Sequence, residues 1–227
     1  TLNVLATAIA TPLTGSLVSL FGRRFVLIFC SASFTLATLA CGMCDSLESL
    51  IFFRVLQGAV GAPLVPLSQA TLLQSYPRDM HARVNAIYGM SVVVGPALAP
   101  SLGGYLSEMY DWRWVFFMMV PLGFLATIGN LQYVKDDGKQ VGSRFDYLGF
   151  TLFSLAIICL QLVLDRGERE DWLDSIYITS LLTFMAISFY MFVVNTGFSA
   201  QPYIDPKIFF NRNYVVGVLL VFVYGSL

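Results

Sequence analysis

The sequence predicts an all-α polytopic membrane protein. Of its 227 residues, 57% are hydrophobic and only 12% are charged, whereas a soluble domain carries about 25% charged residues. The charges occur in short clusters, and the apolar runs between them are about 20 residues long, the length that an α-helix needs to cross a bilayer. A membrane β-barrel would instead show alternating segments of about ten residues. A helical bundle with several spans is therefore the predicted fold class.

The charge clusters delimit seven spans and the start of an eighth. We expect spans at residues 1–20, 25–44, 49–73, 84–107, 112–134, 147–165 and 174–195, with the eighth opening near residue 214. Acidic residues lie in the connections or at span ends, and none lies in the middle of a span. These spans therefore contain no obvious carboxylate that could carry a proton through the membrane.

Basic residues set the orientation of the spans, because lysine and arginine in short loops stay on the cytoplasmic side. Nine of the thirteen fall in alternate connections: Arg23, Arg24, Arg78, Arg83, Lys135, Lys139, Arg144, Lys207 and Arg212. The opposite connections hold Arg113, Arg166 and Arg169. The larger set is expected in the cytoplasm, so the opening span runs from outside to inside. If the complete protein begins in the cytoplasm, the simplest arrangement has one further span before residue 1.

Arg54 lies inside the apolar span 49–73. An arginine near a helix centre costs about 2.5–3.5 kcal/mol on insertion scales, whereas each leucine or phenylalanine returns only about 0.3–0.6 kcal/mol. The span can insert, but the guanidinium needs a water-filled cavity, a carboxylate or backbone carbonyls to face. Gln57 follows on the same helix face. The alternative is that Arg54 lies close enough to the outer end to extend into the headgroups.

Small residues and prolines interrupt the span 84–107. They are Gly89, Gly95, Pro96, Ala99, Pro100, Gly103 and Gly104. Gly95, Ala99 and Gly103 recur every fourth residue and form a stripe of small residues on one helix face, which allows a neighbouring helix to approach closely. The prolines each remove a backbone donor, so we expect a kinked and tightly packed helix. Ordinary small-residue packing is the alternative to a functional role.

The connection between the first two spans runs from Gly15 to Arg24, and its basic residues are explained by topology alone. Taken in chain order, however, the three patterns resemble the major facilitator superfamily of secondary transporters, and most closely its fourteen-span drug:proton antiporters of the EmrB/QacA type. The segment Gly15 to Arg24 resembles the loop motif G-x-L-x-D-R-x-G-R-R, with Ser19 and Leu20 at the positions of the acid and the first base. Arg54 to Gly58 resembles the R-x-x-Q-G motif of the fourth span.

Other segments are similar to the same branch. Gly95 to Gly104 is similar to the antiporter motif G-P-x-x-G-G of the fifth span, with Ala99 at the position of a glycine and with Gly95 and Pro96 as a second Gly-Pro pair one turn earlier. Asp111 to Gly123 is similar to the entry of the sixth span, Leu164 to Trp172 to the connection between two additional central helices, and Pro202 to Tyr214 to the loop that enters the second half.

The resemblance implies a division of the chain into three parts. Residues 1–134 would hold spans two to six of the N-terminal helical bundle, without its first span. Residues 135–195 would form a cytoplasmic loop and the two extra central helices, and residues 196–227 a cytoplasmic loop and the start of the C-terminal bundle.

The function that the resemblance implies is proton-coupled export of drugs or other small lipophilic or cationic compounds, by alternating access, across a bacterial inner membrane. Arg54 and Gln57 would line the cavity and influence proton coupling. A gate would be formed by Gly95, Pro96, Ala99, Pro100, Gly103 and Gly104, and the cytoplasmic loop motif would act through Gly15, Gly22, Arg23 and Arg24. A metabolite importer or facilitator of the same superfamily, and a membrane scaffold or sensor without transport, are the alternatives.

No cofactor or metal is expected. The chain has one histidine and four cysteines, and it lacks a Walker-type loop and a nucleophile elbow, so neither an intramembrane enzyme nor an ATP-driven pump is favoured. The net charge of −1 offers no basic surface for nucleic acid. The expected partners are protons, a small-molecule substrate and the lipid bilayer, and the resemblance leaves a periplasmic adaptor protein open.

Overall fold

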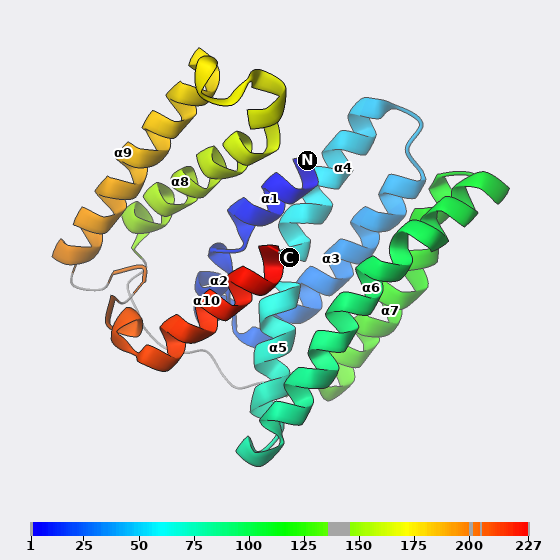
Figure 1. The fold of residues 1–227 in the computed structure, drawn as a ribbon. Helices are drawn as coiled ribbons and strands as arrows, with labels where there is room; N and C mark the ends of the chain where they lie inside the picture. The colour runs from blue at the N-terminus through cyan, green and yellow to red at the C-terminus, as the bar shows by residue number, and fades with distance from the viewer. Residues whose placement is uncertain (1, 136–145, 200–201, 205, 227) are drawn as a thin grey trace. The chain divides into compact units, whose positions relative to one another are not determined.

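The computed structural model describes residues 2–135, 146–199, 202–204 and 206–226, and every regular element in that part is a helix (Figure 1). Contacts divide the chain into two compact units, Thr1–Gly142 and Ser143–Leu227. Six of the described helices are long and apolar enough to cross a membrane, and a bent pair adds a seventh span if it counts as one. The predicted fold class is therefore confirmed. Lys139 and Arg144, both expected in a cytoplasmic loop, lie outside the described residues, and the three-part division stays a prediction.

The first unit contains five successive spans. They are α1 (Leu2–Ala10) with α2 (Leu13–Phe21), α3 (Arg23–Gly42), α4 (Leu47–Gly61) with α5 (Leu64–Ser75), α6 (His81–Met109) after the short η1 (Arg78–Met80), and α7 (Arg113–Tyr133). Their bounds lie close to the predicted spans, because the length of each apolar run is set by the thickness of the bilayer.

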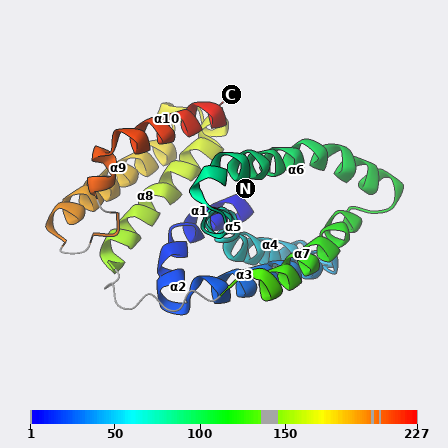
Figure 2. The same cartoon turned by 90° about the horizontal axis from the view of Figure 1, so that it is seen from below.

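Two of these spans are interrupted at a proline. The axes of α1 and α2 differ by 53° across Thr11 and Pro12, and α4 ends just before Ala62 and Pro63. Proline lacks the N–H that an α-helix needs, and its ring crowds the preceding turn. The two prolines inside α6, Pro96 and Pro100, do not end it, because the helix continues through both (Figure 2). The kink expected there stays a prediction.

The buried hydrophobic cluster of the first unit joins α3, through Val26, Leu27 and Cys30, to Leu67 of α5. On another side of α3, α7 runs beside it along its length (Figure 2). The approach depends on glycine, because an added Cβ at Gly42 would lie 2.7 Å from the ring of Phe117, and one at Gly123 would clash with Thr35. Asn130 of α7 donates a hydrogen bond of 3.3 Å to Ser31 of α3. Small residues thus allow close helix contact where both surfaces are apolar and the hydrophobic effect gives no preference.

The second unit begins with a pair of helices that pack along their length. It contains α8 (Tyr147–Arg166), η2 (Gly167–Glu170), η3 (Trp172–Asp174), α9 (Ile176–Phe198), η4 (Pro206–Phe210) and α10 (Arg212–Ser226). The last of these begins two residues before the predicted start of the eighth span.

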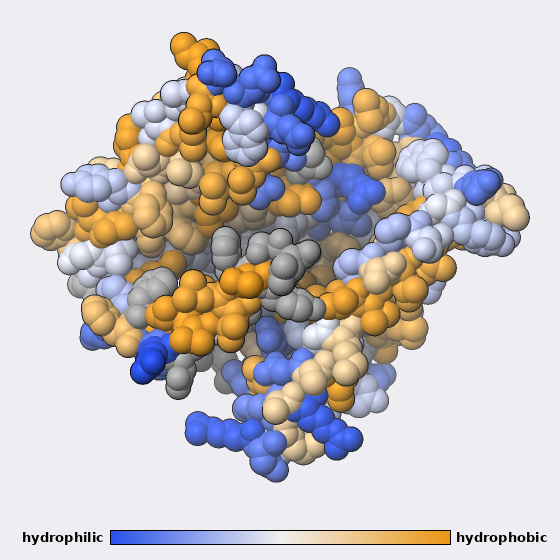
Figure 3. Space-filling view, in the orientation of Figure 1, coloured by the Kyte–Doolittle hydropathy of each residue, from blue (hydrophilic) through white to orange (hydrophobic). Residues whose placement is uncertain are grey.

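The hydrophilic residues gather at the α8–α9 connection, at the top of Figure 3, and around η1, at its bottom, whereas hydrophobic side chains cover the helix middles.

Asp146 joins the ends of α8 and α9. Its carboxylate accepts hydrogen bonds from the Gly149 N–H at 2.8 Å, from the Asn195 amide at 2.8 Å and from the Tyr203 N–H at 3.2 Å. It therefore caps the first turn of α8, where a negative charge is favourable. Tyr203 packs on Phe150, with ring centroids 5.8 Å apart, and burial raises the pKa of its phenol.

We expect Gly123→Ala to lower the thermal stability of the purified protein by about 1–3 kcal/mol, because the added methyl group would overpack the α3–α7 contact. Gly129→Ala is the matched control on the same helix, since nothing lies within 4 Å of a Cβ at that position. That control should be neutral or slightly stabilising, because alanine favours a helix over glycine. Equal unfolding temperatures for the two variants in detergent would contradict the packing argument.

Candidate functional site

Arg54 lies in the middle of α4 and is exposed, whereas its neighbour Gln57 is only 4% exposed. One guanidinium nitrogen of Arg54 lies 3.4 Å from the Gln57 side-chain oxygen. The guanidinium carbon also lies 4.4 Å from the centre of the Phe116 ring of α7, within the range of a cation–π contact. Arg54 and Gln57, predicted to share a face, do so.

Hydrogen bonds fix the orientation of the Gln57 amide. The Thr38 hydroxyl of α3 donates to the Phe34 carbonyl at 2.7 Å. That hydroxyl has one proton, so its oxygen can only accept from the Gln57 amide nitrogen, which lies 2.7 Å away. The Gln57 oxygen must then point the other way, toward Arg54. The buried Thr38 thus directs the Gln57 oxygen, a neutral acceptor, toward the Arg54 guanidinium.

The helix α1 closes the same cluster from a third side. The Asn3 amide donates to the Arg54 backbone carbonyl at 2.7 Å, and the Thr7 hydroxyl lies 3.1 Å from the Gly58 carbonyl. A Cβ at Gly58 would clash with the backbone of Asn3. The glycine that ends the R-x-x-Q-G pattern therefore lets α1 reach α4 closely enough to make these bonds.

The partners of Arg54 are neutral, and no carboxylate in the described part of the chain forms an ion pair with it. Its guanidinium reaches one turn toward the C-terminal end of α4, although helical side chains usually lean toward the N-terminus. On the predicted topology this direction leads away from the outer headgroups. The contact with Gln57 therefore favours a guanidinium directed along α4 away from the outer surface over one that extends into the outer headgroups.

A second arginine, Arg113, ties the start of α7 to the connection between α3 and α4. It donates to the Cys44 carbonyl at 3.0 Å and forms ion pairs with Asp45 at 2.9 Å and with Asp111 at 3.2 Å. The two acids therefore neutralise Arg113, one of the basic residues expected on the outer side. Arg113 thereby holds two outer connections together.

The loop motif lies at the opposite ends of the helices. Gly22 joins α2 to α3 with a φ of +84°, a conformation that favours glycine. Arg23 bonds to Gln74 of α5, and Arg24 donates at 3.0 Å to the Leu131 carbonyl in the last turn of α7, where a cation is favourable. Gly15 has nothing within 4 Å of an added Cβ. The two arginines thus bridge α3 to two other spans, contacts that topology alone does not require.

The small-residue stripe of α6 is open in the described structure. No described residue lies within 4 Å of a Cβ added at Gly95, Gly103 or Gly104, and no described side chain of α6 is buried. The helix meets α5 through Tyr88, whose hydroxyl donates to the Val65 carbonyl at 2.9 Å. The tight packing expected of the stripe, including Pro96, Ala99 and Pro100, is therefore absent among the described residues. Its role as a gate stays a prediction.

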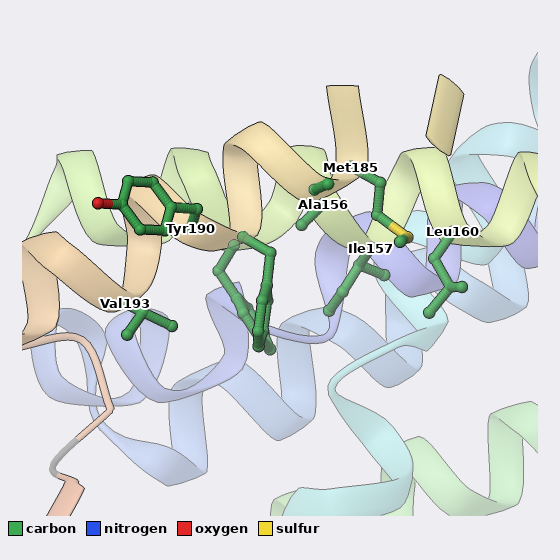
Figure 4. A pocket seen from close by; sticks show the side chains of 9 residues that line it. Ala156, Ile157, Leu160, Met185, Tyr190 and Val193 are labelled. Carbon is green, nitrogen blue, oxygen red and sulfur yellow. The ribbon is translucent and has the colours of Figure 1, made fainter. Parts of the chain in front are cut away.

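An apolar groove of about 660 Å³ lies between α8 and α9 in the second unit. Figure 4 shows Ile157 and Leu160 of α8 beside Met185 and Val193 of α9 along it. Its lining offers almost no polar atom, so it has the character of a surface for acyl chains or another apolar helix. It contains none of the residues that the sequence analysis singled out.

Three residues of the Arg54 cluster were missed in the sequence analysis: Asn3, Thr38 and Phe116. Asn3 could have been predicted from the sequence, because it is an amide in an otherwise apolar span and stands one turn before Thr7. Nothing in the sequence distinguishes Phe116 from the other eighteen phenylalanines. Its position over Arg54 depends on how α7 meets α4.

Comparison with known proteins identifies the family to which the chain belongs. The family model described as "Major Facilitator Superfamily" matches residues 1–226. The chain is 37% identical over 217 residues to the multidrug export protein EmrB of Escherichia coli K12, which covers 95% of this chain and 42% of that protein. It is 37% identical to the fatty acid resistance protein FarB of Neisseria gonorrhoeae over 94% of this chain and 42% of that protein, and 27% identical to multidrug resistance protein 3 of Bacillus subtilis over 95% and 42%.

The chain thus spans less than half the length of these curated relatives. The family match nevertheless runs through all the described spans, and the resemblance found on the Gly15–Arg24, Arg54–Gly58 and Gly95–Gly104 segments points the same way. This multi-pass membrane chain belongs to the major facilitator superfamily.

Proposed function

We propose that the complete protein is a proton-driven exporter of small lipophilic or cationic compounds in a bacterial inner membrane. The observation that carries the proposal is the position of Arg54, a permanent charge held where α1, α3, α4 and α7 converge on neutral partners. Relatives named for multidrug export and fatty acid resistance support the substrate class. A periplasmic adaptor protein as a partner stays a prediction.

The neutral surroundings of Arg54 supply a mechanism for coupling. A guanidinium remains charged at any physiological pH, so a carboxylate that approaches it is stabilised in the ionised form and loses its proton. When a change of conformation separates the two groups, the pKa of that carboxylate rises and the proton returns. No described span carries a mid-span acid, so the carboxylate in this proposal lies in a part of the protein outside the sequence described here.

The exposed small-residue stripe on α6 is the second feature that supports the proposal. In alternating access, two bundles rock against each other around a midplane site, and their contact surfaces must separate and close again. A face without protruding side chains can close against a partner helix without gaps. Gly95 and Gly103 present such a face, and no described residue fills it. We place the closing surface between the bundles on this stripe.

We expect Arg54→Ala to reduce proton-driven transport by about tenfold or more, which corresponds to about 1.4 kcal/mol. The physical reason is the loss of the charge that shifts the carboxylate pKa. The measurement is substrate uptake into proteoliposomes that contain the complete protein in the orientation for export, with and without an imposed proton gradient.

Arg83→Ala provides the matched control, because it removes the same charge from an exposed position at the start of α6. That variant should keep full coupling, and Arg54→Lys should retain part of it. Full coupling in Arg54→Ala would refute the role proposed for Arg54.

Gly95→Leu and Gly103→Leu should abolish transport in the complete protein while leaving its unfolding temperature and its membrane insertion nearly unchanged. The bulky side chains meet nothing in the described bundle, but they would prevent closure against a second one. Gly89→Leu is the control on the same helix, between one and two turns before the stripe begins, where the surroundings are equally open. If Gly89→Leu and the two stripe variants lose transport to the same degree, the stripe is not the closing surface.

A further inference from the structure

A line of contacts connects the outer connections to Arg54. Phe116, in the first turn of α7, is 5% exposed, and its ring faces the Arg54 guanidinium at 4.4 Å. Trp112 lies one turn earlier and meets Phe116 edge to face, with ring centroids 6.0 Å apart and planes at 86°. The guanidinium of Arg113 lies 5.0 Å from the Trp112 ring. Two arginines are thus joined through two aromatic rings.

The ring of Phe116 is one of few groups that orient Arg54. The other side-chain contact of Arg54, with the Gln57 oxygen, is long at 3.4 Å. It therefore restrains the guanidinium only weakly. A cation is attracted to the negative face of an aromatic ring. Phe116 is buried and therefore held in one place, whereas the Arg54 side chain is exposed and has few other groups to fix its direction. Without the ring, the guanidinium would be free to turn away from Gln57.

The position of the Phe116 ring depends in turn on Arg113. The first turn of α7 is held against the α3–α4 connection by the bond from Arg113 to the Cys44 carbonyl and by the ion pair with Asp45. Asp45 is 94% exposed on its side chain, so that ion pair is screened by water. The bond to the backbone carbonyl is therefore the more durable part of the anchor. A displacement of this turn would carry Phe116 off Arg54.

We propose that Phe116 is a positioning residue for Arg54 and that Arg113 holds it in place, so that movement of the outer connections is transmitted to the coupling site. The proposal rests on the coupling role proposed for Arg54. Opening of the outer side would release the first turn of α7, withdraw the ring and free the guanidinium. Closing would restore the contact. Arg54 would thereby be oriented differently in the outward-open and outward-closed states.

The decisive experiment replaces Phe116 in the complete protein by phenylalanines with one, two and three ring fluorines, using nonsense suppression. Fluorine withdraws electron density from the ring face while changing its shape little, so a cation–π contact weakens stepwise whereas packing does not. We expect proton-driven transport to fall progressively along the series. The same series at Phe117 is the control, because that ring packs on Gly42 and Trp114 rather than on Arg54. A flat response at Phe116 would overturn the proposal.

A second measurement does not require transport. Thermal unfolding of the purified protein is compared for Phe116→Leu, Arg54→Met and the double variant, and again with Arg113→Gln in place of Arg54→Met. Coupled residues give shifts in unfolding temperature that do not add, whereas independent ones do. We expect non-additive shifts in both cycles and additive shifts when Phe117→Leu replaces Phe116→Leu.

The two measurements separate failure of the inference from failure of the proposed function. If the unaltered protein shows no proton-driven transport, the proposed function is wrong, and the unfolding cycles still decide whether Phe116 holds Arg54. Additive shifts in the Arg54 cycle would refute the positioning role. Additive shifts in the Arg113 cycle alone would refute the link to the outer connections.

Discussion

The structure of the first unit depends on how a charged guanidinium is accommodated in an apolar span. Arg54 cannot be placed against lipid at acceptable cost, and α4 itself supplies only the Gln57 oxygen. The other helices supply the rest: Asn3 of α1 bonds to the Arg54 backbone carbonyl, Thr38 of α3 turns the Gln57 amide, and the Phe116 ring of α7 lies against the guanidinium. Four spans therefore meet around Arg54 and Gln57.

These helices can converge only because glycines occupy their crossing points. Gly58 admits the backbone of α1, and Gly42 and Gly123 admit Phe117 and Thr35 at the α3–α7 contact. In lipid, apolar faces do not attract one another through the hydrophobic effect, so close van der Waals contact and hydrogen bonds decide which helices pair. The glycines of α6 are different, because the described chain places nothing against them. Glycines that set the internal packing are thus distinguished from glycines on a free face.

The two ends of the first unit, outer and cytoplasmic on the predicted topology, are tied by arginines in different ways. At one end Arg113 bonds to the Cys44 carbonyl and to two carboxylates, and its aromatic neighbours lead to Arg54. At the other, Arg24 bonds to a carbonyl at the end of α7. The helix α7 is therefore held at both ends, and its first turn carries the ring that lies against Arg54. The proposed transmission between the outer connections and Arg54 uses that first turn.

The sequence by itself determined the approximate bounds of the spans and the anomaly of Arg54, because bilayer thickness and the cost of a buried charge act on each segment alone. The distribution of basic residues gave the expected orientation, and the resemblance of three motifs indicated the family. The sequence did not determine which helices meet. Asn3, Thr38 and Phe116 joined the site only through tertiary contacts, and the break between α1 and α2 at Pro12 was not expected. An apolar residue suits lipid and a neighbouring helix equally well, so periodicity cannot tell the two apart. Only the tertiary structure decides that choice.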